Sequence, residues 1–259
     1  MSITFSVTDA LATITLARPS AHNALDAEMK IALRGAVDAA RADDSVRAVL
    51  ITADGKNFCV GQDLGEHVAA LDADPSTAMD TVENHYNPLI RSLSEVGVPV
   101  VVAIPGACVG AGWGIALTGD ILVAGSSTTF ATAFTGIGLA SDSGLSHALV
   151  ESLGASRAAA LFLLGDKVTA GQAETWGLVH RVVPDEEVRS AAETLAGALA
   201  AGPTEAYRQV KALVRANATG LSETLDREAA AQTALGQTSD HRSAVSAFLA
   251  KQRPAFTGR

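Results

Sequence analysis

The spacing of hydrophobic residues along this chain changes near residue 187. Before that point, short apolar runs at 47–52 and 98–104 alternate with segments of helical spacing at 25–44 and about 76–96. Short apolar runs are typical of buried strands, and apolar residues three or four positions apart are typical of helices packed on a sheet. The first part of the chain is therefore predicted to form an α/β layer structure.

The remaining elements of this part follow the same alternation. Residues 3–8 and 11–17 change between apolar and polar at every second position around Asp9-Ala10, which predicts a β-hairpin. A strand is expected at 121–124, and the segment 128–134 continues the pattern. Helices are expected near 143–153, 155–164 and 170–176.

After residue 187 the pattern is helical throughout. Ala- and Leu-rich stretches with apolar stripes are separated by glycine breaks, and helices are expected at 187–201, 204–218, 221–236 and 239–251. We interpret these helices as a packing or assembly element, because their apolar stripes need a surface to cover them. The predicted organisation is a core at 1–190 followed by a helical region at 191–259.

Composition narrows the class of protein. The 259 residues are 48% hydrophobic, which allows a large core, and their net charge of −9 without a basic cluster argues against an extended nucleic-acid surface. The N-terminus lacks a signal pattern and the most apolar stretch is broken by Pro105, so a soluble cytoplasmic protein is expected. Cys59 and Cys108 have no metal-ligand spacing and are interpreted as core-filling thiols, so no metal site is predicted.

Two glycine-punctuated loops carry the main chemical signal. NFCVGQDL at 57–64 and GACVGAGWGIALTGD at 106–120 each follow one of the apolar strands. Their glycines let the main chain approach a ligand and leave N–H groups that can bind an oxyanion, so the pair points to an enzyme acting on acyl esters. Tight strand-to-helix packing is the simpler interpretation of the glycines. A dinucleotide site is rejected because Ile115 stands where the GxGxxG motif needs glycine.

Asp142 is the main candidate for proton transfer. It lies in the apolar segment 136–150, where burial would raise its pKa and suit it to that role. Alternatively, Asp142 caps the helix that follows, where helix polarity would lower its pKa. His147 is expected on a helix surface or in side-chain packing, and His85 is the histidine that we consider for the lining of a pocket.

The chain resembles the crotonase, or enoyl-CoA hydratase/isomerase, superfamily along essentially its whole length. The resemblance rests on RPSAHNALD (18–26), FCVGQDL, GACVGAGWGIALTGD, FATAFTGIGLASDSG and the ending VSAFLAKQRPAFTGR. It implies a spiral of ββα units, of α/β (α+β) class, with a C-terminal helical trimerisation region. It also implies an acyl-CoA thioester as substrate, coenzyme A being part of the substrate, and a homotrimer or homohexamer with no cofactor, nucleic acid or membrane partner.

The same resemblance implies roles for individual residues. The main-chain N–H groups of Gln62 and Ala111 would form the oxyanion hole, and Asp142 would act as acid and base. Lys251 matches a basic position near the 3′-phosphate of CoA, reached from the same or a neighbouring subunit. The substrate- and CoA-binding residues implied are Ser20, Ala21, His22, Gly61, Asp63, Leu64, Gly110, Phe134 and Lys251.

The chain departs from the superfamily's hydratases at the residues that activate water. Those hydratases carry two glutamates where this chain has Gly114 and Phe134. Asp142 matches the aspartate of dienoyl-CoA isomerases, of chlorobenzoyl-CoA dehalogenases and of the phenylacetate-pathway isomerases that convert ring-1,2-epoxyphenylacetyl-CoA to oxepin-CoA. The last group is the most similar, so an isomerase is expected. The alternatives are an enoyl-CoA hydratase of fatty-acid degradation, a dehalogenase that uses His85, and a CoA-ester-binding protein without catalysis.

Overall fold

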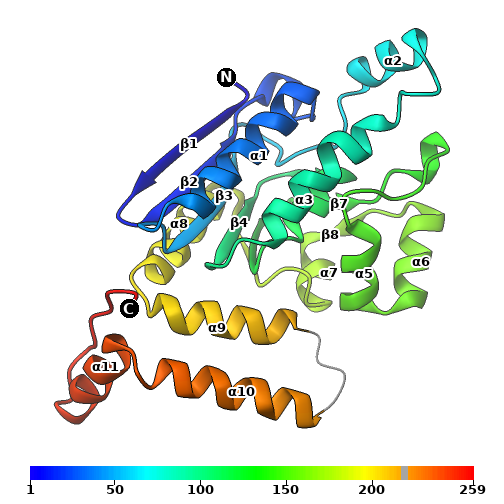
Figure 1. Ribbon diagram of the computed structural model, residues 1–259. Coiled ribbons are helices and arrows are strands. Elements are labelled where there is room, and N and C mark those ends of the chain that lie inside the picture. The colour runs from blue at the N-terminus through cyan, green and yellow to red at the C-terminus, as the bar shows by residue number, and fades with distance from the viewer. Residues whose placement is uncertain (217–220) are drawn as a thin grey trace.

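The computed structural model describes residues 1–216 and 221–259, and within these residues the main sheet has six strands in the order β1-β2-β3-β4-β6-β9 (Figure 1). The pair β1–β2 is antiparallel, and the other neighbours are parallel. The strands are β1 (Ile3–Thr8), β2 (Leu11–Leu16), β3 (Ala48–Ala53), β4 (Val100–Ile104), β6 (Ile121–Gly125) and β9 (Arg181–Val183). A smaller sheet contains β5 (Ala107–Val109), β7 (Thr129–Ala131) and β8 (Val168–Thr169).

Helices cover both faces of the main sheet. Helix α1 (Ala27–Ala42) packs on β1 and β2 beside α3 (Asn87–Ser94), and α8 (Val188–Ala200) packs on β3 and β4. Side chains of β3 alternate between these layers, since Ile51 joins the part of the core that contains α1 and Leu50 joins the part that contains α8. Burial on both faces explains why β3 and β4 are apolar runs rather than alternating strands.

The remaining helices lie outside these two layers. Helix α2 follows β3, and a short helix α4 follows β5, so each of the two glycine loops leads into a helix. They are α2 (Leu64–Ala73), α4 (Ala111–Ala116), α5 (Leu145–Leu153), α6 (Ala155–Leu164), α7 (Ala170–Thr175), α9 (Thr204–Arg215), α10 (Leu221–Leu235) and α11 (Ser239–Leu249). The α/β class predicted from the hydrophobic pattern is confirmed.

Differences from the predicted elements are local. The helix expected at about 76–96 is wrong at its start, since a π-helical turn at Val82–Tyr86 leads into α3. The Asp74 side chain accepts a hydrogen bond from the Ser76 N–H at 2.9 Å, which offers this segment a turn in place of a helix. Helix α2 and the strands β5, β8 and β9 were not predicted, and the strand pattern at 128–134 is regular only in β7. The end of the helix expected at 204–218 lies outside the described residues.

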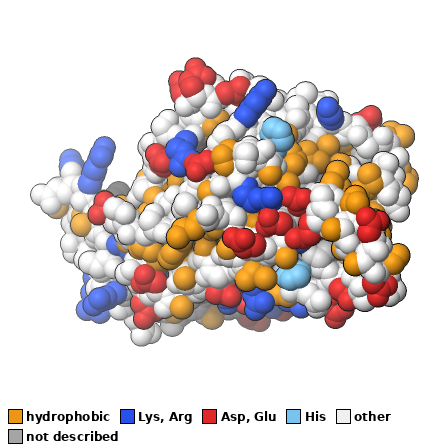
Figure 2. Space-filling model, turned by 90° about the horizontal axis from the view of Figure 1, so that it is seen from above, with side chains coloured by type: hydrophobic (Ala, Val, Ile, Leu, Met, Phe, Trp, Pro, Cys, Tyr) orange, Lys and Arg blue, Asp and Glu red, His pale blue; other side chains and the backbone are white. Residues whose placement is uncertain are grey.

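The C-terminal helices extend away from the sheet. Figure 1 shows α9 and α10 side by side below it, with α11 and the C-terminus at one end. The expected boundary at 190/191 falls within α8, and both that boundary and the expected homotrimer or homohexamer stay predictions. No helix of the described residues is long and apolar enough to span a membrane. On the face seen in Figure 2, Lys and Arg side chains lie scattered among Asp and Glu.

Candidate active site

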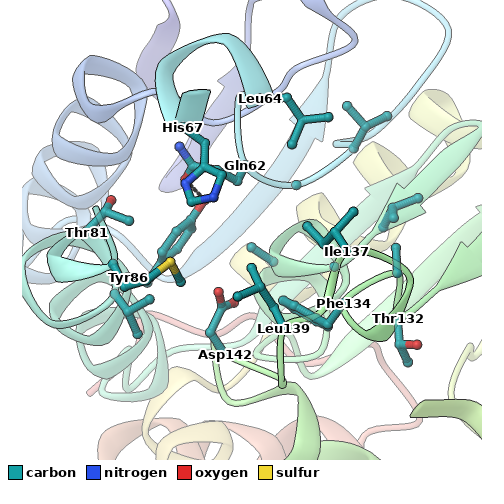
Figure 3. Close-up of a pocket in the computed structure, with 18 residues that line it drawn as sticks. Gln62, Leu64, His67, Thr81, Tyr86, Thr132, Phe134, Ile137, Leu139 and Asp142 are labelled. Carbon is teal, nitrogen blue, oxygen red and sulfur yellow. Dashed lines mark hydrogen bonds between the residues drawn. The ribbon is translucent and has the colours of Figure 1, made fainter. Parts of the chain in front are cut away.

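The two glycine loops meet at a cavity of about 250 Å³ (Figure 3). A β-bridge between Cys59 and Cys108 joins the loop after β3 to β5. It brings Gly61 so close to the second loop that a Cβ atom on Gly61 would lie 3.7 Å from the Ala111 nitrogen. The two loops therefore lie side by side and form one wall of the cavity. The other walls are largely apolar and include Leu64, Met79, Val82, Phe134, Ile137 and Leu139.

The main-chain N–H groups of Gln62 and Ala111 are free to bind a ligand. Within the described residues neither group donates a hydrogen bond, and both residues line the cavity. The carbonyl of Gly61 accepts the Leu25 N–H at 2.8 Å, and this bond holds the Gly61–Gln62 peptide so that its N–H points away from Leu25. Ala111 is the first residue of α4, where an N–H has no partner inside the helix. The arrangement suits two donors to one carbonyl oxygen.

Among the described residues that line the cavity, Asp142 is the one carboxylate. Its Oδ1 accepts a hydrogen bond from the Ser143 hydroxyl at 2.8 Å. Burial raises the pKa of Asp142, and the Ser143 hydrogen bond and the charge of Lys30 offset part of this rise. The helix-cap interpretation is wrong, because α5 begins at Leu145 with Gly144 at its N-cap, and no side chain of the described residues caps this helix. Asp142 is therefore available as a proton acceptor.

Gly114 lies against the segment that carries Asp142. A Cβ atom on Gly114 would lie 2.5 Å from the carbonyl oxygen of Ser143 and 2.8 Å from its Cβ atom. No side chain fits at position 114 unless the segment around Ser143 moves. Phe134, which the resemblance places at the position of the second hydratase glutamate, presents an apolar ring to the cavity (Figure 3). Neither position offers a group that can deprotonate water.

The segment 18–26 lies beside the first glycine loop. Leu25 forms a β-bridge with Gln62, and the Arg18 guanidinium contacts the carboxylates of Asp26 at 3.1 Å and Asp63 at 3.0 Å. The Asp63 side chain also caps α2 by accepting the Glu66 N–H at 3.1 Å, a hydrogen bond that lowers its pKa together with Arg18. Ser20 and His22 are exposed beside this junction. Among the implied binding residues, the cavity itself is lined by Gly61, Leu64, Gly110 and Phe134 and not by Ser20, Ala21, His22, Asp63 or Lys251.

The histidines are arranged differently from the prediction. His85 does not line the cavity, and its Nδ1 lies 3.1 Å from the hydroxyl of Thr81. His67 of α2 does line the cavity (Figure 3). Tyr86, which follows His85 in the π-helical turn, also lines it. The sequence marked neither residue, because α2 has no clear apolar stripe and the turn interrupts the helical period. His147 is exposed and pairs with Glu151 at 3.3 Å, as expected of a surface histidine.

Other candidate groups take no part in this cavity. Burial raises the pKa of the Cys59 thiol to about 12 and that of Cys108 well above its ordinary value, so both are core thiols as predicted. Lys251 follows α11, at the end of the chain that lies far from α2 in Figure 1. Within residues 1–216 and 221–259, no group of three or more His, Cys, Asp or Glu side chains is arranged to hold a metal ion.

Comparisons with known proteins agree with this geometry. The Enoyl-CoA hydratase/isomerase family model matches residues 6–259. The 1,2-epoxyphenylacetyl-CoA isomerase of Escherichia coli is 39% identical over 95% of each chain, and a Rhodobacter capsulatus protein provisionally named an enoyl-CoA hydratase is 38% identical over 100% of this chain and 98% of its own. A solved structure of a provisionally assigned enoyl-CoA hydratase/isomerase from Mycobacterium abscessus superposes with a TM-score of 0.98 at 56% identity, covering 99% of this chain and 100% of that one.

Proposed function

The chain belongs to the enoyl-CoA hydratase/isomerase family, and we propose that it is an acyl-CoA isomerase in which Asp142 is acid and base. The observation that carries the proposal is that a single carboxylate, with its pKa raised by burial, lines the same cavity as two free main-chain N–H groups. One carboxylate is enough to move a proton between two carbons of one substrate.

The proposed reaction is a proton shift along a conjugated thioester. Asp142 removes a proton from the carbon next to the thioester carbonyl, and the electron pair of that C–H bond moves onto the carbonyl oxygen. The N–H groups of Gln62 and Ala111 bind the resulting negative charge, and each such donor stabilises the transition state by about 3 kcal/mol. Protonated Asp142 then returns the proton to a carbon further along the conjugated system, so the double bond moves and no atom is gained or lost.

Gly114 and Phe134 favour isomerisation over hydration. Hydration requires a water molecule to be held and deprotonated, and neither residue has a group for this step. A glutamate at position 114 would also collide with Ser143. The segment that carries Asp142 therefore leaves no room for a hydratase carboxylate at this position. Since His67 lines the cavity and carries a basic ring, hydration assisted by His67 is the second candidate function.

The proposed substrate class is a compact, unsaturated or aromatic acyl group. A cavity of about 250 Å³ walled by Tyr86, Phe134 and aliphatic side chains suits one ring or a short chain. The E. coli relative is an isomerase of 1,2-epoxyphenylacetyl-CoA. We therefore place two reactions first among those to be tested: shifts of enoyl double bonds, and conversion of this epoxide to oxepin-CoA, in which the bond between the two epoxide carbons also breaks and the ring double bonds shift.

A panel of CoA thioesters tests the proposal directly. The purified protein is offered ring-1,2-epoxyphenylacetyl-CoA, pairs of 2-enoyl- and 3-enoyl-CoA isomers, and crotonyl-CoA, and products are followed by mass spectrometry and absorbance. The expected result is conversion without change of mass, with slow or undetectable hydration of crotonyl-CoA. Rapid gain of one water would support the His67-assisted hydratase, and binding without turnover of any thioester would indicate a non-catalytic protein.

A further inference from the structure

A fully buried lysine lies directly behind the cavity wall. The side chain of Lys30, on α1, has 0% of its surface exposed. Its ammonium donates hydrogen bonds to the Thr81 hydroxyl at 2.6 Å, to Gln62 Oε1 at 3.0 Å and to Glu66 Oε1 at 3.2 Å, and lies 4.8 Å from the centre of the Tyr86 ring. Segments far apart in the sequence therefore converge on one positive charge.

The contacts of Lys30 centre on Gln62, whose N–H forms half of the proposed oxyanion hole. The side-chain oxygen of Gln62 accepts hydrogen bonds from Lys30 and from the Tyr86 hydroxyl at 2.7 Å (Figure 3). Its amide nitrogen donates to Glu66 Oε1 at 3.0 Å. Glu66 is held in turn by the Ala27 N–H at 2.6 Å, at the start of α1. The side chain of Gln62 is thus tied to two helices and to the π-helical turn.

The surroundings of Lys30 contain more negative than positive charge. Burial lowers the pKa of Lys30, and the carboxylates of Glu66, Asp26 and Asp142 raise it in part. His85, on the π-helical turn, has its pKa lowered by burial and by the charge of Lys30. Lys30 and Asp142 therefore act on each other across the cavity wall, with Glu66 partly neutralising Lys30.

We propose that Lys30 is a positioning residue, which holds the side chain of Gln62 and keeps a fixed positive charge beside the cavity that Asp142 lines. This inference rests on the proposed function for its role in turnover. The cation favours the ionised form of Asp142, which is the form that accepts a proton, and it favours the negative charge that develops on the substrate. Glu66 limits this effect, so the two residues set the charge of the site in opposite directions.

The opposite effects of Lys30 and Glu66 on the titration of Asp142 can be tested. Lys30→Met removes the positive charge and is expected to raise the midpoint of Asp142 titration, whereas Glu66→Gln leaves Lys30 uncompensated and is expected to lower it, each by about half a pH unit or more. A residue that only supports the fold would move both midpoints in the same direction or neither. Titration is followed by NMR of isotope-labelled aspartate side chains, and the Asp142 signal is assigned from its loss in Asp142→Asn.

A matched control is available elsewhere in the chain. Lys211 is a second buried lysine, paired with Asp120 at 2.5 Å, and it does not line the cavity. Lys211→Met is expected to leave the Asp142 midpoint unchanged. If Lys30→Met does not fold, Glu66→Gln carries the test alone, because 34% of the Glu66 side-chain surface is exposed and the substitution keeps its shape.

The outcomes separate this inference from the proposed function. Opposite shifts of the midpoint support the role of Lys30 even if no thioester is turned over, in which case the proposed function fails by itself. With an active substrate, the acid limb of kcat/KM should move in the same directions as the NMR midpoint. Equal shifts, or no shift in Glu66→Gln, would overturn the inference whatever the activity.

Discussion

Two buried lysines of this protein occupy similar surroundings and serve different regions. Lys30 lies behind the cavity with Glu66 as its carboxylate partner, and Lys211 of α9 lies beside the starts of the inner strands β4 and β6 with Asp120 as its partner. Burial lowers the pKa of both, that of Lys211 to about 8. The neighbours differ, since Lys30 is bound to polar side chains of the cavity wall, whereas Lys211 also donates to the Val98 carbonyl at 2.7 Å.

A perturbed pKa alone therefore does not identify a functional group. Lys211, with Arg215 of the same helix, binds Asp120 and so fastens α9 to the loop between α4 and β6. Removing it is expected to affect the attachment of α9 and not the chemistry. Lys30 makes the same kind of ion pair, but its other partners are Gln62, Thr81 and Tyr86, which all line the cavity. The location of the partners distinguishes the two roles.

The largest difference in turnover between the two regions is expected when their aspartates are substituted. Asp142→Asn should lower isomerase turnover at least about a hundredfold, because asparagine cannot accept the proton. Asp120→Asn, which weakens the anchor of α9, should leave kcat within about twofold while lowering the free energy of unfolding by about 1–3 kcal/mol. Steady-state kinetics and urea unfolding measure both effects. Wild-type turnover in Asp142→Asn would remove Asp142 from the mechanism.

A glycine-to-alanine substitution in each region should also have different effects on turnover. Gly114→Ala places a Cβ atom against the Ser143 carbonyl and should displace Asp142, lowering kcat about tenfold to a hundredfold. Gly197→Ala in α8 meets nothing within 4 Å and should leave kcat unchanged, with a gain in stability of about 0.5–1 kcal/mol. Circular dichroism establishes that both variants fold. Unchanged turnover in Gly114→Ala would contradict the coupling between Gly114 and Asp142.

The smallest expected effect is the pH dependence that Lys211 contributes to stability. The folded protein releases this proton at about pH 8, whereas the unfolded chain holds it up to the ordinary pKa of 10.5. The unfolded state therefore binds more protons between these values, and the contribution of Lys211 to the free energy of unfolding rises with pH. Urea unfolding at several pH values should show a steeper rise in the wild type than in Lys211→Met. Equal slopes would mean that Lys211 titrates normally in the folded protein.

Much of the fold follows from local sequence. Apolar runs buried on both faces form β3 and β4, and the Asp26 side chain accepts the Met29 N–H at 2.8 Å at the start of α1, as expected of a helix cap. Short strands such as β5 and β8 were not predicted, because two or three residues show no period and their pairing is decided by distant strands. Helix α2 was missed because most of its surface is exposed and carries no continuous apolar stripe.

The residues of the candidate site also fall into those that the sequence predicted and those that it did not. The two glycine loops and Asp142 were found from local sequence, because glycines punctuate the loops and Asp142 is a carboxylate in an apolar segment. Gln62 and Ala111 were named within those loops from the family resemblance. Lys30, His67 and Tyr86 were not named from the sequence. Lys30, for example, contacts residues more than thirty positions away, Gln62 and Thr81 among them. The glycine loops with free N–H groups, and the carboxylate in an apolar segment, can be found from local sequence. The charges around that carboxylate are known from the folded chain alone, because burial and Coulomb forces depend on distances through space and not along the chain.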